Sequence, residues 1–133
     1  MNRAVRVLLD TSVIIDLAGV ELGVHESAEP AVSAVSLGEL AFGLDIDDPI
    51  ERRARTERYQ AVREQFAVLA FDGRAAEIYG TMAAVIRRAG RNPRPRRMDL
   101  QIAATAAAHS IPLITRDIDG FTALERLLDV VVV

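Results

Sequence analysis

The sequence predicts a three-layer α/β/α domain with a mostly parallel central sheet, and three observations support this fold class. Short apolar runs alternate with longer segments whose apolar residues recur at helical spacing, as strands and helices do in α/β proteins. The apolar runs end abruptly at polar residues, as short buried strands of parallel sheets do. A chain of 133 residues, half of them hydrophobic, also suits one core. We therefore expect one domain over residues 1–133.

The N-terminal part of the chain contains a predicted strand, a helix and a loop. Residues 5–9 form the strand. The apolar positions that follow recur at helical spacing, so we expect a short helix that is capped by Thr11 or Ser12 and ends before Gly19. Residues 19–30 have the composition of a loop.

Two helices are predicted in the middle of the chain. The segment Ser36-Leu37-Gly38-Glu39 has capping-box spacing, so we expect the second helix to begin near Ser36 and to hold Glu39 in its first turn. Residues 50–66 alternate Arg and Glu with apolar residues, which predicts an exposed, ion-paired third helix.

The C-terminal half repeats the alternation of strands and helices. Residues 68–71 favour a strand, and Asp72 is the expected cap of a helix that ends by Gly90. After a Pro-rich breaker at 92–95, the Ala-rich residues 98–109 favour another helix. The last predicted elements are a strand at 113–115, a helix at 121–127 and a strand at 130–133.

Composition excludes several classes of chemistry. The chain has no Cys, which rules out disulfides, thiolate zinc sites and cysteine nucleophiles. Its 16 cationic residues are all Arg, so Schiff-base chemistry and a P-loop are excluded, and so is an aspartyl-phosphate site that needs a lysine. There is neither an apolar run of membrane-spanning length nor a signal-peptide pattern, so we expect a soluble, cytoplasmic protein without a membrane partner.

Four acidic residues are the candidates for a catalytic site. Asp10 and Asp117 each follow a predicted strand, where open α/β sheets bind their ligands. Glu39 and Asp99 lie near predicted helix starts that can face the same edge. Four carboxylates in one cleft raise each other's pKa unless a cation offsets them. We therefore expect Mg²⁺, with Mn²⁺ as an alternative, and metal-assisted phosphodiester cleavage.

The motifs that hold these acids resemble those of the PIN domain family. They are LLDTSVIIDL, SAVSLGELAFGL and MDLQIAATAAAHSIPLITRD followed by GF, and they span nearly the whole chain in the expected order. More narrowly, the chain resembles the VapC-type toxins of type II toxin–antitoxin pairs. The resemblance implies a metal site formed by Asp10, Glu39, Asp99 and Asp117, and a Mg²⁺-dependent endoribonuclease that inhibits growth. It also implies a homodimer and a VapB-type antitoxin whose C-terminal segment occludes the active site.

The fourth acid differs from the family pattern. Asp119 and Gly120 precede Phe121 here, so either Asp117 or Asp119 can serve the metal, and we favour Asp117. Thr11, Ser12 and Thr115 are candidates for orienting carboxylates or metal-bound water, with Asp119 as a fourth candidate for this supporting role. Each acid also has an ordinary alternative: a helix cap for Asp10, a capping box for Glu39, a first-turn acid for Asp99 and a turn residue for Asp117.

An arginine-rich segment is the candidate RNA contact. It comprises Arg87, Arg88, Arg91, Arg94, Arg96 and Arg97 and contains no acid. The net charge of −3 does not oppose RNA binding, because a metal would offset the four site acids and leave 15 acids against 16 arginines. The guanidinium fork suits phosphate, although a solvated surface is the simpler alternative.

Two further expectations concern function and DNA. A non-catalytic PIN-like module that binds RNA or protein would keep the fold and the partner without turnover, and metal-dependent cleavage separates it from the nuclease. The sequence has no DNA-binding motif, so operator DNA would be bound only through the antitoxin.

Overall fold

The computed structural model describes residues 6–16, 28–117 and 119–133. In chain order its elements are β1 (Arg6–Leu9), α1 (Thr11–Ile15), β2 (Glu29–Ser33), α2 (Ala34–Phe42), α3 (Pro49–Gln65), β3 (Ala67–Leu69), α4 (Gly73–Arg88), the 3₁₀ helix η3 (Arg94–Arg96), α5 (Arg97–Ala108), β4 (Leu113–Thr115) and β5 (Val130–Val132).

The central sheet has five strands in the order β3-β2-β1-β4-β5, and every neighbouring pair is parallel. The chain builds outward from β1 in one direction through β2 and β3, and in the other through β4 and β5. The strand order therefore reverses between β1 and β4, which pair through Leu8 with Leu113 and Leu9 with Ile114. The crevice at the carboxyl ends of these two strands is where such sheets bind ligands.

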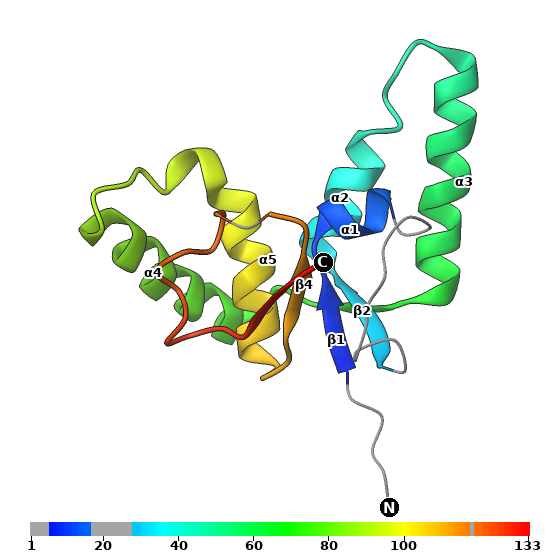
Figure 1. Ribbon diagram of the computed structural model, residues 1–133. Helices are drawn as coiled ribbons and strands as arrows, with labels where there is room; N and C mark the ends of the chain where they lie inside the picture. Colours follow the sequence, from blue (N-terminus) through cyan, green and yellow to red (C-terminus); the bar gives the residue numbers. More distant parts are fainter. Residues whose placement is uncertain (1–5, 17–27, 118) are drawn as a thin grey trace, which may run out of the picture.

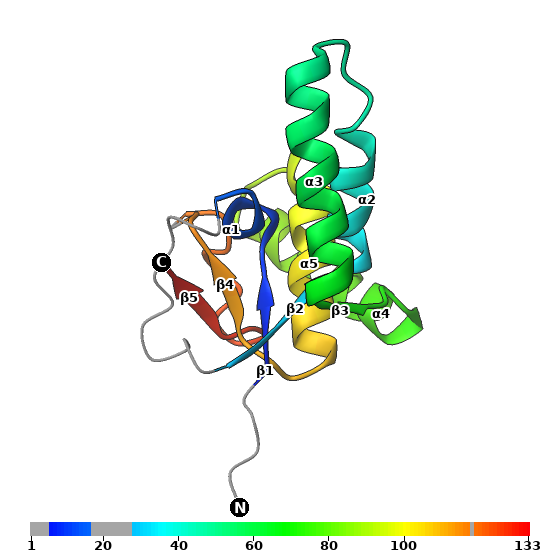
Figure 2. The same ribbon diagram turned by 90° about the vertical axis from the view of Figure 1, so that its right-hand side faces the viewer.

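Helices cover both faces of this sheet, with α4 and α5 on one side and α3 on the other (Figure 1). Successive strand residues point to opposite faces. Leu8 and Leu113 accordingly pack in one core with residues of α4 and α5, while Leu9 and Ile114 pack in the other with residues of α1 and α3. The predicted three-layer α/β/α fold with a parallel sheet is confirmed, and the view in Figure 2 shows α3 lying across one face.

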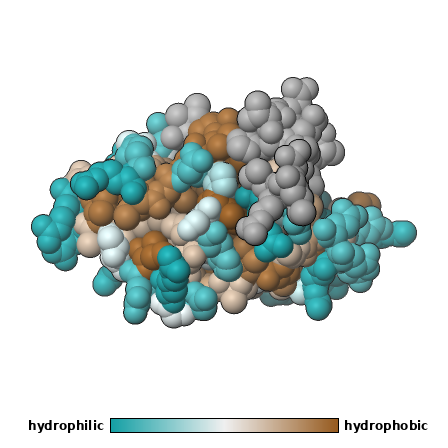
Figure 3. Space-filling model, turned by 90° about the horizontal axis from the view of Figure 1, so that it is seen from below, coloured by the Kyte–Doolittle hydropathy of each residue, from teal (hydrophilic) through white to brown (hydrophobic). Residues whose placement is uncertain are grey.

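The surface at the amino ends of the strands has a mixed character. Seen from below, it combines hydrophobic and hydrophilic side chains, with hydrophilic groups gathered toward both ends of the molecule (Figure 3). None of the described helices is long and apolar enough to cross a membrane.

One strand differs from the sequence prediction. Residues 19–30 were expected to form a loop, yet Glu29 and Pro30 begin β2, which pairs with β1 and β3. A proline at the second of five positions hides the strand, because proline removes a ladder donor. Pairing on both sides stabilises β2 despite this weak local preference. The rest of the expected loop, residues 19–27, lies outside the described residues.

The start of the second helix also differs. It begins at Ala34, and the Ser33 hydroxyl caps it by accepting from the Val35 amide at 3.1 Å. Ser36 is fully buried within the helix. The capping-box interpretation was therefore wrong, and Glu39 lies in the middle of α2.

At the C-terminal end, the predicted helix at 121–127 is a series of turns. Ala123 has a φ of 81°, which interrupts helical geometry. The expected strands at 68–71 and 130–133 are present with shifted limits, as β3 and β5.

Ser33→Ala should lower the free energy of unfolding by about 1 kcal/mol, because it removes the cap of α2. The Thr105 hydroxyl would lose its 3.1 Å contact with Ser33 but would keep its bond to the Gln101 carbonyl. Urea denaturation of the metal-free protein measures the change, and unaltered stability would contradict this helix start.

Candidate functional site

Asp10 lies at the centre of the carboxyl edge of the sheet. It directly follows β1 and occupies the N-cap position of α1, but its side chain makes no capping hydrogen bond. Oδ2 accepts from the hydroxyls of Ser12 at 2.9 Å and Thr115 at 2.8 Å. Oδ1 is buried and has no partner within the described structure. The carboxylate, only 5% exposed, is thus held from one side and left unsatisfied on the other.

Two strands cooperate to fix this carboxylate. The Asp10 amide donates to the Ile114 carbonyl of β4 at 2.8 Å. Thr115, the last residue of β4, is fully buried; its hydroxyl donates to Asp10 and accepts from the Asp117 amide at 3.1 Å. The parallel pairing of β1 with β4 therefore determines where Oδ2 lies. The N-cap position is Asp10, so the expected caps, Thr11 and Ser12, were one and two residues too late.

Glu39 reaches the site from α2. Its Oε1 accepts from the Thr11 hydroxyl at 3.0 Å. Because that hydroxyl has one hydrogen, its 3.0 Å contact with Ser36 must be a bond that Ser36 donates. Burial raises the pKa of Glu39 above its ordinary value of 4.5, and the charges of Asp99 and Asp10 add to the increase. The carboxylate thus lies within the electrostatic reach of both aspartates.

Asp99 lies in the first turn of α5. Burial is the main cause that raises its pKa above 3.8, followed by the charge of Asp10, while Arg96 opposes the increase. Asp10, which follows β1, thus lies at one edge of the sheet with Glu39 of α2 and Asp99 of α5, and the pKa values of Glu39 and Asp99 are raised first by burial and then by neighbouring acidic charges.

Asp117 is placed differently from the other three acids. Its Oδ1 accepts from the amides of Asp119 at 3.1 Å and Gly120 at 3.0 Å, as in an Asx turn. Its Oδ2 accepts from Arg96 at 2.6 Å, and this hydrogen bond lowers the pKa of Asp117 below 3.8. Both of its oxygens therefore have donors already. Asp119 is exposed, and its side chain makes no hydrogen bond to the described residues.

The arginine-rich segment follows the end of α4 and leads into α5. Five of its members are exposed: Arg87, Arg88, Arg91, Arg94 and Arg97. Arg96 differs, because its guanidinium donates to Asp117 and, at 3.4 Å, to Asp99. For Arg96 the structure shows carboxylate partners, whereas the expected contact with RNA stays a prediction for all six.

The donor set suits a hard divalent cation. A buried carboxylate oxygen without a partner, such as Asp10 Oδ1, is costly unless a cation satisfies it. Oxygen ligands of this kind are those that Mg²⁺ and Mn²⁺ prefer. Within residues 6–16, 28–117 and 119–133, no three acidic or histidine side chains already surround one point closely enough to hold an ion. Among the candidate metal ligands, Asp10 therefore has a fixed position. Glu39 and Asp99 are partly exposed and would move toward it to share an ion.

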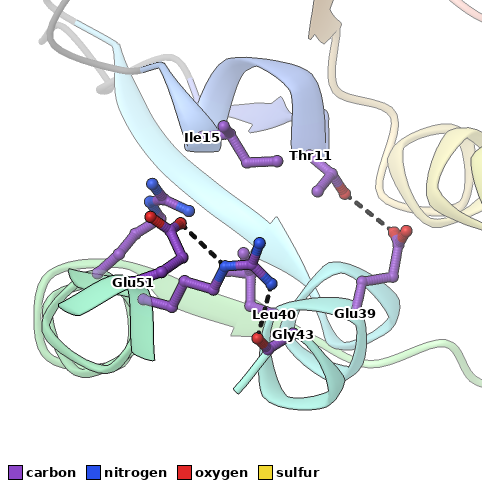
Figure 4. Close-up of a pocket in the computed structure, with 8 residues that line it drawn as sticks. Thr11, Ile15, Glu39, Leu40, Gly43 and Glu51 are labelled. Carbon is purple, nitrogen blue, oxygen red and sulfur yellow. Dashed lines mark hydrogen bonds and ion pairs between the residues drawn. The ribbon is translucent and has the colours of Figure 1, made fainter. Parts of the chain in front are cut away.

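A pocket of about 360 Å³ opens beside Glu39. Figure 4 shows Thr11 and Glu39 pointing toward one another on one side, with Gly43 and Glu51 on the other. Arg55 donates to Glu51 at 3.1 Å and to the Gly43 carbonyl at 2.8 Å, and Arg58 also lines the pocket. The lining of the pocket therefore combines two acids, Glu39 and Glu51, with two arginines, of which Arg55 is paired with Glu51.

Sequence reasoning missed three contributors to the site. The sequence predicts a cap for Ser36, an exposed helix face for Arg58 and an RNA contact for Arg96, and none of these assignments includes the contact that the structure shows. Only Arg96 has a local signal, since it precedes Asp99 by three residues and such pairs meet on a helical turn. The contacts of Ser36 and Arg58 depend on tertiary packing.

Comparisons with known proteins identify the family and the fold. A family model described as the PIN domain matches residues 7–127. The chain is 35% identical over 117 residues to Ribonuclease VapC4 of Mycobacterium tuberculosis, covering 86% of this chain and 88% of the relative. It is similar in structure to VapBC-5 of M. tuberculosis, a member of the VapBC family of toxin–antitoxin systems. The TM-score is 0.79 and the sequence identity 30%, and the similarity covers 96% of this chain and 97% of the other. FitAcB of Neisseria gonorrhoeae gives a TM-score of 0.69 and 26% identity over 93% and 95%.

Glu39→Gln should stabilise the metal-free protein at neutral pH by less than about 1 kcal/mol, because the half-exposed site screens the repulsion that it removes. The pKa of Glu39 is higher in the folded than in the unfolded protein, so its ionised form costs stability above that raised pKa. The cost disappears as the pH falls toward the unfolded value, because wild-type Glu39 then binds a proton itself. Thermal melts in EDTA at neutral and mildly acidic pH test this, and a gain that grows on acidification would contradict it.

Proposed function

The chain belongs to the PIN domain family, and on that premise we propose that it is a Mg²⁺-dependent endoribonuclease, the toxin of a VapBC-type toxin–antitoxin pair. The observation that carries the proposal is the unpartnered, buried Oδ1 of Asp10 beside Glu39 and Asp99. The 35% identity to a VapC ribonuclease supports the choice of RNA as substrate.

Each acid has a distinct task in this proposal. Bound Mg²⁺ or Mn²⁺ would polarise the scissile phosphate and favour ionisation of water. Asp10 holds the cation in place, because Ser12 and Thr115 leave only its Oδ1 available. Asp99 adds a second carboxylate from α5. Glu39, oriented by Thr11, positions the attacking water and accepts its proton. Asp117 is the fourth acid of the set, at present held by Arg96.

RNA is bound mainly through its backbone. Of the five exposed arginines, Arg94 lies in η3 and Arg97 is the first residue of α5, two residues before Asp99. Arg58, which lines the same pocket as Glu39, offers a further positive group. These guanidinium groups would hold a strand at the acids by its phosphates.

The partners follow from the same family. A VapB-type antitoxin neutralises the toxin, and the similarity to VapBC-5 supports this assignment. We further propose that the protein is a homodimer, which joins its antitoxin in a hetero-oligomer and binds operator DNA only through that antitoxin. In this proposal it acts in the cytoplasm, where it cleaves RNA and so arrests translation and growth.

Cleavage of total cellular RNA by purified, antitoxin-free protein tests the activity. We expect discrete fragments with Mg²⁺ or Mn²⁺ and none with EDTA. Asp10→Asn and Asp99→Asn should each lower the rate about a hundredfold or more, because each removes a charged ligand.

Asp129→Asn is the matched control, an exposed acid immediately before β5 whose loss should leave the rate unchanged. Circular dichroism verifies that each variant folds. If the folded wild-type protein binds RNA or an antitoxin but cleaves nothing under any condition, the non-catalytic PIN-like module becomes the better account.

Salt dependence tests the arginine contacts. In EDTA, where cleavage is blocked, the logarithm of RNA affinity should fall with the logarithm of salt by about 0.7 per phosphate contact. The double substitution Arg94→Gln with Arg97→Gln should therefore reduce the slope by about 1.4, as measured by fluorescence anisotropy. An unchanged slope would show that these arginines are only a solvated surface.

A further inference from the structure

An arginine of the chain itself lies among the carboxylates of the site. Arg96 is the last residue of η3 and immediately precedes α5. Its Nη2 donates to Asp117 Oδ2 at 2.6 Å and to Asp99 Oδ2 at 3.4 Å. One nitrogen thus bridges acids from two segments that are distant in sequence. A cation is therefore already present beside two of the four proposed metal ligands.

The surroundings of Arg96 hold it in this position. Its Cζ lies 5.8 Å from the centroid of the Phe121 ring, within the range of a cation–π contact. Gly120 also lies against the ion pair. A Cβ at this position would overlap both Arg96 Nη2 and Asp117 Oδ2, so the ion pair fits only because residue 120 is Gly.

Burial distinguishes Arg96 from its neighbours. Its side chain is 33% exposed, whereas the other arginines of the segment are exposed surface residues. Its Nε is buried and has no hydrogen-bond partner among the described residues. An unsatisfied donor is unfavourable, so the attraction of Asp99 and Asp117 must compensate for it. Such a placement is expected of a group that neutralises charge and not of a mobile surface cation.

We propose that Arg96 is a positioning residue that acts as an internal counter-cation: it offsets part of the charge of Asp99 and Asp117 in the metal-free protein and competes with a divalent cation for these two carboxylates. This inference rests on the metal site of the proposed function. It assigns to Arg96 a role other than the phosphate contact that its neighbours are expected to make.

Two physical effects give Arg96 control over metal affinity. Its positive charge repels a divalent ion beside the same carboxylates, and across several ångströms of well-solvated protein this repulsion corresponds to about a tenfold change in affinity. In addition, Arg96 occupies Asp117 Oδ2 while the backbone amides occupy Oδ1, so Asp117 is not available as a ligand until Arg96 moves. Removing the guanidinium relieves both constraints.

Calorimetric titration with Mn²⁺ in the absence of RNA tests the proposal on the full chain. Arg96→Gln should bind Mn²⁺ about tenfold more tightly than wild type. In EDTA the same variant should melt at a lower temperature, because Asp99 and Asp117 lose their shared cation. Added metal should therefore raise its melting temperature by more than it raises that of wild type.

Two variants separate charge from other effects. Arg94→Gln removes the same charge from the same short helix, at an exposed residue, and should leave Mn²⁺ affinity unchanged. Arg96→Lys keeps the charge and should restore affinity toward that of wild type. Should Arg96→Gln fail to fold, Arg96→Met keeps the packing on Phe121 and should show the same tighter binding.

The outcomes distinguish this inference from the proposed function. If wild type binds Mn²⁺ and the folded Arg96→Gln or Arg96→Met variant binds it equally or more weakly, Arg96 is not a competing cation, and the nuclease proposal still stands. A lower melting temperature with unchanged affinity would mark Arg96 as a structural clamp only. If none of the proteins binds metal, both the metal site and this inference are wrong.

Discussion

The parallel pairing of β1 with β4 is the constraint on which the site depends. It places Thr115 beside Asp10, so that a buried hydroxyl holds one carboxylate oxygen at 2.8 Å while the other is left without a partner. The reversal of strand order at the same place opens the crevice into which α2 and α5 bring Glu39 and Asp99. The fold thus concentrates negative charge at one edge of the sheet, and the rest of the site responds to that charge.

The rest of the site interacts with these acids in two ways. The first is local: Thr11, Ser12 and Thr115 donate hydroxyl hydrogens to Glu39 and Asp10, which orients these groups without neutralising them. The second is electrostatic, since Arg96 supplies a positive charge to Asp99 and Asp117. One arginine cannot balance four carboxylates, and burial together with neighbouring acidic charges raises the pKa of both Glu39 and Asp99. A divalent ion would neutralise the remaining negative charge of the acids. Because such an ion would also polarise a scissile phosphate, the charge of the site connects the fold with phosphodiester cleavage.

The features of this structure that have a local sequence pattern could be predicted. Short apolar runs shortly before Asp10 and Asp117, and the Ala-rich helix that begins near Asp99, are clear in the sequence, so the fold class and four candidate acids could be predicted from it. The pairing that makes Pro30 part of a strand and the burial of Ser36 against Thr11 arise from tertiary contacts and not from local preference. The ion pair of Arg96 was missed for a different reason: a run of six arginines looks like a surface, and only packing against Phe121 and Gly120 distinguishes one of them.

The central claim is that Asp10 Oδ1 is the fixed ligand of a divalent cation. Its most direct test is a crystal structure of the antitoxin-free protein with Mn²⁺, using anomalous scattering to locate the ion. The account predicts an anomalous peak at a bonding distance of about 2.0–2.2 Å from Asp10 Oδ1, with Asp99 or Glu39 drawn toward it. A well-ordered structure in which Mn²⁺ binds elsewhere, or in which Asp10 Oδ1 is satisfied by a protein donor, would contradict it.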